Sequence, residues 1–351
     1  MAEQRFRSED LRTFATQVLT KAGLPEDRAR VVAGILVEGD LLGQTTHGLN
    51  LMTPYMASIE EGSMTMTGEP TVVSDLPGAF AWDGNFLPGA WLVTKAMEQA
   101  MDRVKTQGVV SAAVCRTHHI GALQAYLKTA TDKGLVMTLM TSDPREESVA
   151  PHGGVDAKFS PNPIAFGVPT QGDPILVDVS MSATTNGMVN RLYKEGKQFA
   201  NPWLQDGYGN PTTDPNVRFS EPKGAIYPVG GPSSGHKGFG MGFMVEMLTS
   251  ALAGHGRNTK PTRWGGNIYI QIIDPAAFGG LDTFTAESTF FAAHCKASPA
   301  PEGRDPVRMP GDGELARRAE QNANGVELYG TIEADLKVLG DKLGIAMPDA
   351  I

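Results

Sequence analysis

The chain has 351 residues, of which 41% are hydrophobic, so it is long enough for two domains with a sizeable core. Its formal net charge of -9 argues against nucleic acid as a partner, because phosphate binding needs a basic face. The sequence predicts a cytoplasmic protein, because its N-terminal segment is charged and it has only two cysteines, too few for a disulfide framework. We expect no membrane partner, because no apolar run is long enough to span a bilayer.

Two helices are predicted near the N-terminus. Ser8 is placed to cap the first helix, and Gly23 to end it in a left-handed conformation. Pro25 suits the first turn of the second helix, which stops near Gly43. Both helices carry apolar residues at helical spacing, namely Leu11, Phe14, Ala15, Val18 and Leu19 in the first and Val31, Val32, Ile35, Leu36 and Leu42 in the second.

The rest of the chain predicts a mixture of strands and helices. Short apolar runs bounded by turn residues predict buried strands at residues 109–115, 135–140, 175–179 and 268–273. Helical patterns occupy residues 98–105, 122–131, 314 onwards and 331–343, and residues 238–253 predict a long, largely buried helix with a glycine-rich start. Residues 194–222 are rich in Gly, Asn, Pro and Asp, which predicts a long surface loop.

The common signatures of enzyme chemistry are missing or weak. No Gly-x-Gly-x-x-Gly follows a predicted strand, so a Rossmann domain is disfavoured. A Gly-x-Ser-x-Gly match at Ser233 precedes Asp274 and His294 in hydrolase order, but the proline before the serine fits a nucleophile turn poorly. No metal-ligand spacing of histidines or cysteines occurs, so we expect no protein-bound metal.

Polar residues gather instead where predicted elements end. They are Thr46-His47-Gly48 after the second helix, Thr117-His118-His119 and Ser142-Asp143 after two strands, Asp178 within a third, and Gly235-His236-Lys237-Gly238 at a helix start. Together they predict a crevice in which helix amides and Lys237 suit a pyrophosphate. Each residue alone also has a structural explanation, such as a hydrogen-bonding histidine or a solvated lysine.

Taken together, these segments resemble the malate/L-lactate dehydrogenase family. The matching stretches run in the family's order over nearly the whole chain: Thr46-His-Gly-Leu, His119-Ile-Gly-Ala, Ser160 to Pro169, Val177 to Ser182, Asn210 to Pro215, Gly235 to Gly240 and Arg308 to Asp312. One such match is weak, whereas seven in order are specific.

The resemblance implies an α/β fold that agrees with the missing Rossmann fingerprint. We expect a nucleotide- and substrate-binding domain on a mainly antiparallel sheet at residues 76–310. Residues 1–75 are expected to form a helical domain that the C-terminal helices at residues 311–351 join. The resemblance also implies a homodimer.

The resemblance also assigns the site. His47 matches the acid/base histidine, Thr46 lies where serine or threonine is usual, Asp178 matches the aspartate that supports the relay, and His119 matches a second histidine assigned as a base in some members. Contacts to NAD or NADP are expected from Ser142, Ser180, Met181, Ser182, His236, Lys237, Pro310, Gly311 and Asp312. The choice of dinucleotide stays open, because Asp143 would repel a 2′-phosphate and Arg145 could attract one.

The function implied is hydride transfer between NAD(P) and a small 2-oxo or 2-hydroxy acid. A reductase of cyclic imino acids and a non-catalytic protein that kept the fold are the alternatives. Many members carry an arginine four residues after the histidine, where this chain has Leu51. Substrates with a second carboxylate should therefore bind poorly, unless Arg145 or Arg191 replaces that cation.

Overall fold

The computed structural model describes residues 4–351, so the first three residues of the charged N-terminal segment lie outside it. Within this range the main sheet has seven strands in the order β2-β3-β4-β11-β5-β6-β7. Their bounds are β2 (Thr71–Leu76), β3 (Ala79–Asp83), β4 (Val109–Thr117), β5 (Val136–Ser142), β6 (Ile164–Val168), β7 (Ile175–Val179) and β11 (Gly266–Ile273). Neighbouring strands are antiparallel except for β3 and β4, which confirms the predicted mainly antiparallel sheet.

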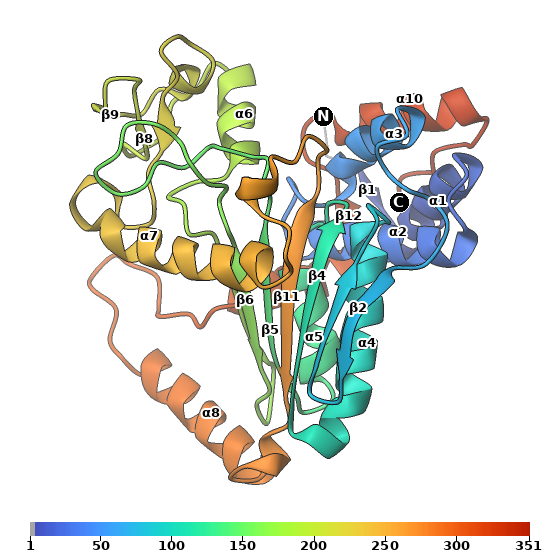
Figure 1. Cartoon of the computed structure of the whole chain (residues 1–351), viewed down its shortest axis with the longest axis vertical. Helices are drawn as coiled ribbons and strands as arrows, with labels where there is room; N and C mark the ends of the chain where they lie inside the picture. The colour runs from blue at the N-terminus through green and yellow to red at the C-terminus, as the bar shows by residue number, and fades with distance from the viewer. Residues whose placement is uncertain (1–3) are drawn as a thin grey trace.

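Helices cover both faces of this sheet (Figure 1). Side chains alternate between the faces of a strand, so Met137 and Leu139 pack with α4 (Gly89–Gln107) and α5 (Gln124–Thr131), while Met140 joins a smaller cluster on the other face. That second face lies under α7 (Gly231–Glu246) and the π-helical turn Met247–Ala251 that continues it. The sheet is therefore the middle layer.

A second, helical part is built from both ends of the chain (Figure 1). It contains α1 (Ser8–Lys21), α2 (Glu26–Leu41), α3 (Met52–Glu60) and α10 (Ile332–Leu343), which share one core cluster. The short strands β1 (Arg5–Phe6) and β12 (Val326–Glu327) pair beside them, and α9 (Asp312–Asn324) packs on α2. The main sheet begins at Thr71, a few residues before the predicted boundary at residue 76. The domain boundaries stay a proposal.

Three local predictions were wrong or incomplete. Ser8 begins α1 rather than capping it, and its hydroxyl lies 3.3 Å from the side-chain oxygen of Asn322. The predicted loop at residues 194–222 contains β8 (Leu204–Gln205) and β9 (Pro211–Thr212), which form a small sheet with β10 (Ala225–Ile226). The helix predicted at residues 238–253 begins at Gly231, and it is not largely buried, because Phe243 is 59% exposed.

Three of the described α-helices had no counterpart among the predicted elements. They are α3, α6 (Asn186–Lys194), which follows β7, and α8 (Leu281–Lys296), which stands apart from the sheet in Figure 1. No side chain of α8 is buried. None of the helices in residues 4–351 is long and apolar enough to cross a membrane.

Candidate active site

A cavity of about 870 Å³ lies where the loop after α2, the ends of β4, β5 and β7, and helix α6 meet. Six of the predicted site residues line it: Thr46, His47, His119, Ser142, Asp178 and Ser180. Leu51 also lines it. The sequence therefore identified residues that the fold brings together from four separate segments.

His47 lies in the loop that follows α2. Its Nδ1 is 2.8 Å from the hydroxyl oxygen of Thr46, and burial lowers its pKa from the usual 6.5. With Nδ1 engaged by its neighbour, Nε2 is the ring atom left to exchange a proton with a ligand. Thr46 thus fixes the orientation of the imidazole, and the catalytic role of the pair stays a prediction.

Asp40 accepts a hydrogen bond from this loop, and it is not among the residues predicted from the sequence. Its Oδ2 accepts the backbone N–H of Leu49 at 2.7 Å, and its Oδ1 has no partner among the described residues. A Cβ added at Gly48 would lie 2.3 Å from that Oδ1, so only glycine fits between the carboxyl group and His47. Burial raises the pKa of Asp40 to about 7. An aspartate followed by two leucines at the end of α2 was the signal available in the sequence.

We expect Asp40→Asn to change how stability depends on pH. A raised folded-state pKa means that the stability from Asp40 is fully present below about pH 4 and is lost as the pH rises through about 7. Asparagine cannot ionise, so the variant should gain on the order of 2–4 kcal/mol relative to the wild type between pH 5 and pH 8. Urea-unfolding curves of both proteins at the two pH values test this, and parallel pH dependences would contradict it.

His119 follows β4 and lies beside His47. The two rings are stacked with centroids 5.7 Å apart. Nδ1 of His119 accepts the backbone N–H of Gly121 at 3.2 Å and lies 2.9 Å from the hydroxyl of Tyr55. A backbone amide can only donate, so Nδ1 carries no proton and the neutral ring carries it on Nε2. Burial, His47 and His118 lower the pKa of His119 well below 6.5, which keeps it neutral.

Asp178 contacts a different element from the one expected. Its Oδ2 accepts the backbone N–H of Gln124, the first residue of α5, at 2.9 Å. No hydrogen bond joins it to His47 within residues 4–351. Burial raises the pKa of Asp178 to about 6. In this structure the carboxyl group therefore fixes the start of α5, and its predicted support of the histidine is not direct.

Several predicted cofactor contacts are engaged within the protein. The Ser142 hydroxyl lies 2.6 Å and 2.8 Å from the hydroxyls of Thr249 and Ser250, and Ser182 donates to the carbonyl of Thr184 at 2.7 Å. Met181 is buried beneath α7. These contacts fix the strand ends around the cavity, so roles toward a cofactor stay predictions.

The segment Pro310–Asp312 lies against β7 rather than in the cavity lining. The Pro310 carbonyl accepts the backbone N–H of Leu176 at 3.0 Å. Gly311 has a φ of 95°, and a Cβ there would lie 2.9 Å from the Leu176 nitrogen. Asp312 pairs with Lys296 of α8 at 2.8 Å. The segment thus connects α8 to the strand that carries Asp178.

His236 and Lys237 also lie outside the cavity lining. Both are exposed, in the second turn of α7, so the expectation that they open this helix was wrong. The His236 ring lies 5.6 Å from that of His152. Gly238 is needed for packing, because a Cβ there would lie 2.4 Å from the backbone nitrogen of Val229.

Comparisons with known proteins agree with this architecture. A family model described as malate/L-lactate dehydrogenase matches residues 6–337. The L-lactate dehydrogenase of Cupriavidus necator is 31% identical over 97% of this chain and 98% of its own. The fold is similar to that of the malate dehydrogenase of Entamoeba histolytica, with a TM-score of 0.93, 23% identity, and 99% of this chain and 100% of that chain covered.

A third relative carries a different name. The delta1-piperideine-2-carboxylate reductase of Pseudomonas syringae superposes with a TM-score of 0.81 and 26% identity, covering 96% of this chain and 99% of its own. The predicted fold class and family are both confirmed by these matches. The chain is a dehydrogenase that belongs to the malate/L-lactate dehydrogenase family.

Proposed function

We propose that the protein interconverts small 2-oxo and 2-hydroxy acids with NAD or NADP, using His47 and His119 at the reacting carbon. The observation that carries the proposal is the stacked pair of imidazoles, 5.7 Å apart, at the wall of a cavity of about 870 Å³. Family membership adds the reaction class. Relatives named for lactate and for malate and sulfolactate support the substrate class.

The two histidines differ in protonation, so they have different roles toward the substrate oxygen. Reduction of a ketone places negative charge on its oxygen, and an imidazolium with a pKa near neutrality is a suitable proton donor. His47 is oriented by Thr46 so that Nε2 holds or gives this proton, and a bound carboxylate would offset the lowering of its pKa by burial. His119, neutral with Nε2–H, donates a hydrogen bond to the same oxygen.

The cavity and its surroundings fit a nicotinamide dinucleotide. A volume of about 870 Å³ exceeds what a small acid needs. Ser180 offers a hydroxyl within the cavity, whereas Lys237 and His236, which are exposed on α7 outside the lining, are expected to contact phosphates from the resemblance alone. The dinucleotide, when bound, supplies or accepts hydride at C2 of the acid. Asp143 and Arg145 both line the cavity, so the preference between NAD and NADP needs measurement.

The direct test measures NADH and NADPH oxidation against a panel of 2-oxo acids and cyclic imines. Turnover of 2-oxo acids supports the proposal. Turnover of cyclic imines alone would instead favour the activity for which the Pseudomonas syringae relative is named. No turnover of any panel member would favour the non-catalytic alternative.

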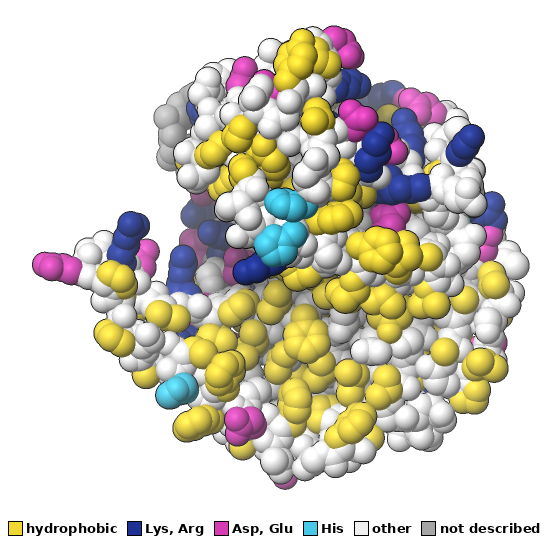
Figure 2. All heavy atoms as spheres, turned by 60° about the vertical axis from the view of Figure 1, so that its left-hand side comes forward, with side chains coloured by type: hydrophobic (Ala, Val, Ile, Leu, Met, Phe, Trp, Pro, Cys, Tyr) yellow, Lys and Arg dark blue, Asp and Glu magenta, His cyan; other side chains and the backbone are white. Residues whose placement is uncertain are grey.

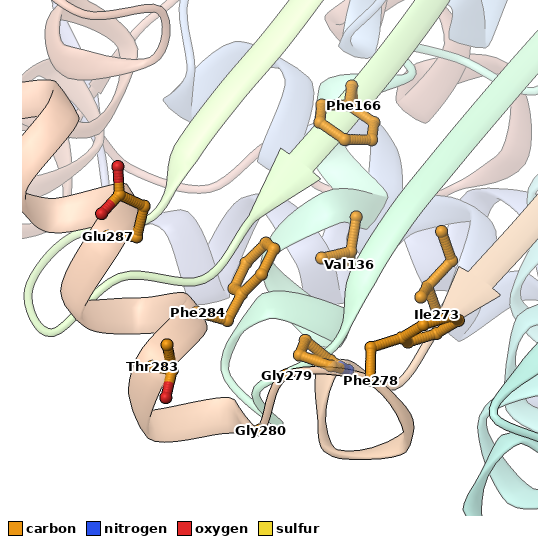
Figure 3. Close-up of a pocket in the computed structure, with 10 residues that line it drawn as sticks. Val136, Phe166, Ile273, Phe278, Gly279, Gly280, Thr283, Phe284 and Glu287 are labelled. Carbon is orange, nitrogen blue, oxygen red and sulfur yellow. The ribbon is translucent and has the colours of Figure 1, made fainter.

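We further propose a homodimer that uses α7 and α8. Phe290 and Phe291 of α8 are 63% and 57% exposed, and Phe243 of α7 is 59% exposed. An apolar cavity of about 440 Å³ lies between α8 and the sheet, where Phe284 faces Val136 and Phe166 (Figure 3). Hydrophobic side chains spread over the side of the molecule that carries both helices (Figure 2). A surface of this kind is typical of a subunit interface.

Light scattering at micromolar concentration should therefore give twice the chain mass of 37.4 kDa. Phe290→Asp combined with Phe291→Asp should shift the mass toward a monomer, because two desolvated charges oppose apolar association. Val338→Asp is the matched control, since Val338 is 67% exposed on α10. A monomeric wild type, or a dimer unaffected by the paired aspartates, would contradict the proposed interface.

A further inference from the structure

The cavity has chemically different walls on the two sides of His47. One side is built from α6 and the loop before His47, and it carries Arg191. The other side runs through His119 to Trp264, which precedes β11. A ligand that reacts at His47 would meet both walls.

The wall beyond His119 is aromatic, and it includes His118, whose two ring nitrogens have no partner among the described residues. The Trp264 ring lies 5.2 Å from the His119 ring at a tilt of 30°, and 4.8 Å from the His118 ring. Leu51 lines the same cavity and is 8% exposed. Burial and Arg263 lower the pKa of His118 to about 3, so this side chain adds no charge at neutral pH. Within this wall, Trp264 and Leu51 therefore provide the surface for an apolar group.

The opposite wall offers a fixed cation. A guanidinium nitrogen of Arg191 donates to the Thr45 hydroxyl at 3.1 Å, and the guanidinium carbon lies 3.9 Å from the centre of the Tyr329 ring. Gly187 brings α6 close to the catalytic loop, because a Cβ there would lie 3.2 Å from the Cβ of Thr46. Arg191 bonds to a hydroxyl, and Glu195, whose pKa it helps to lower, bonds to Lys197 and Tyr329 instead, so the guanidinium is available to an anionic ligand.

We propose that the substrate lies across His47 with its C1 carboxylate on Arg191 and its side group on Trp264 and Leu51. The substrate class is then a 2-oxo or 2-hydroxy acid with an apolar side group of phenyl or isobutyl size. This inference rests on the proposed function and adds the orientation and the size of the acid. An aromatic side group gains most, because aromatic pairs contribute beyond the area that they bury.

Steady-state kinetics with phenylpyruvate, 4-methyl-2-oxopentanoate and pyruvate test the apolar wall. The wild type should prefer the first two over pyruvate by about tenfold or more in kcat/KM. Trp264→Ala should lower kcat/KM for phenylpyruvate by about tenfold and for pyruvate by less than about threefold, and Trp264→Phe should restore most of the loss. Trp203→Ala, which removes a tryptophan beside Phe199 outside the cavity lining, is the control.

The cation is tested with Arg191→Met and Arg191→Lys. Arg191→Met should raise KM for every 2-oxo acid by about ten- to a hundredfold, and Arg191→Lys should raise KM by less. The dinucleotide Kd, measured by fluorescence titration, should stay unchanged in Arg191→Met. Arg145→Met tests the other arginine of the cavity lining, and Arg30→Met, at an exposed position of α2 outside that lining, is the matched control. A raised dinucleotide Kd in Arg191→Met, or the rise in KM appearing in Arg145→Met instead, would overturn the assignment.

The possible failures are distinct. If the wild type reduces no 2-oxo acid with either dinucleotide, the proposed function fails. If it reduces pyruvate as well as phenylpyruvate, or if Trp264→Ala lowers both equally, the proposed function stands and the orientation across His47 is wrong.

Discussion

His47→Ala is expected to lower kcat by at least about a hundredfold, because general acid catalysis commonly contributes that much or more. The dinucleotide Kd should change by less than about twofold, since the residues proposed to hold the cofactor lie on other elements. The structure supports the role of His47, whose Nδ1 is engaged by Thr46 while the ring lines the cavity. Steady-state kinetics and a fluorescence titration of the dinucleotide measure the two effects.

His255→Ala is the matched control for this variant. Its ring lies 3.3 Å from the Thr259 hydroxyl in a turn after α7, outside the cavity lining. Added imidazole should restore part of the activity of His47→Ala, because the cavity would retain space for the missing ring. Wild-type turnover in a folded His47→Ala protein would remove His47 from the mechanism and leave His119 as the remaining candidate.

The sequence predicted several of the helices and strands that carry the longest apolar stripes or runs. Helices α1 and α2 have apolar stripes that enter one core, and β4, β5 and β11 are buried in the centre of the sheet. It missed β2, whose six residues are all exposed, and α8, which has no buried residue. Periodicity reports burial, so exposed elements give no such signal, but α3 and β3 were missed although Tyr55 and Trp82 are buried.

The site residues fall into two groups: those that belong to a local sequence pattern, and those that only the fold brings into contact. His47, His119 and Asp178 were identified because each belongs to a short sequence pattern, and the fold brings them to one cavity. Tyr55 was missed because it reaches His119 across 64 residues of sequence. Trp264 was missed for the same kind of reason, since only the register of β11 against β4 brings it beside the histidines. Long-range placement is a property of the fold that spacing does not encode.

Oxaloacetate is expected to be a poor substrate, with kcat/KM about ten- to a hundredfold below that of 2-oxopentanoate. A charge-assisted hydrogen bond contributes about 1.5–3 kcal/mol, which corresponds to that factor when it is missing. Leu51 cannot supply such a bond, because its side chain packs in the helical core and presents only apolar surface to the cavity. Parallel kinetics on the two acids measure the difference.

Leu51→Arg should narrow this difference by raising kcat/KM for oxaloacetate. The arginine stem would follow the path of the leucine beside α3, and the guanidinium would reach the cavity that Leu51 lines. The thermal midpoint of the variant must be measured in parallel, since Leu51 is 8% exposed and its replacement costs core packing. If oxaloacetate is already the best substrate of the wild type, a cation such as Arg191 must bind the second carboxylate. The C1 carboxylate would then need a different partner, and the apolar wall at Trp264 would face the wrong end of the acid.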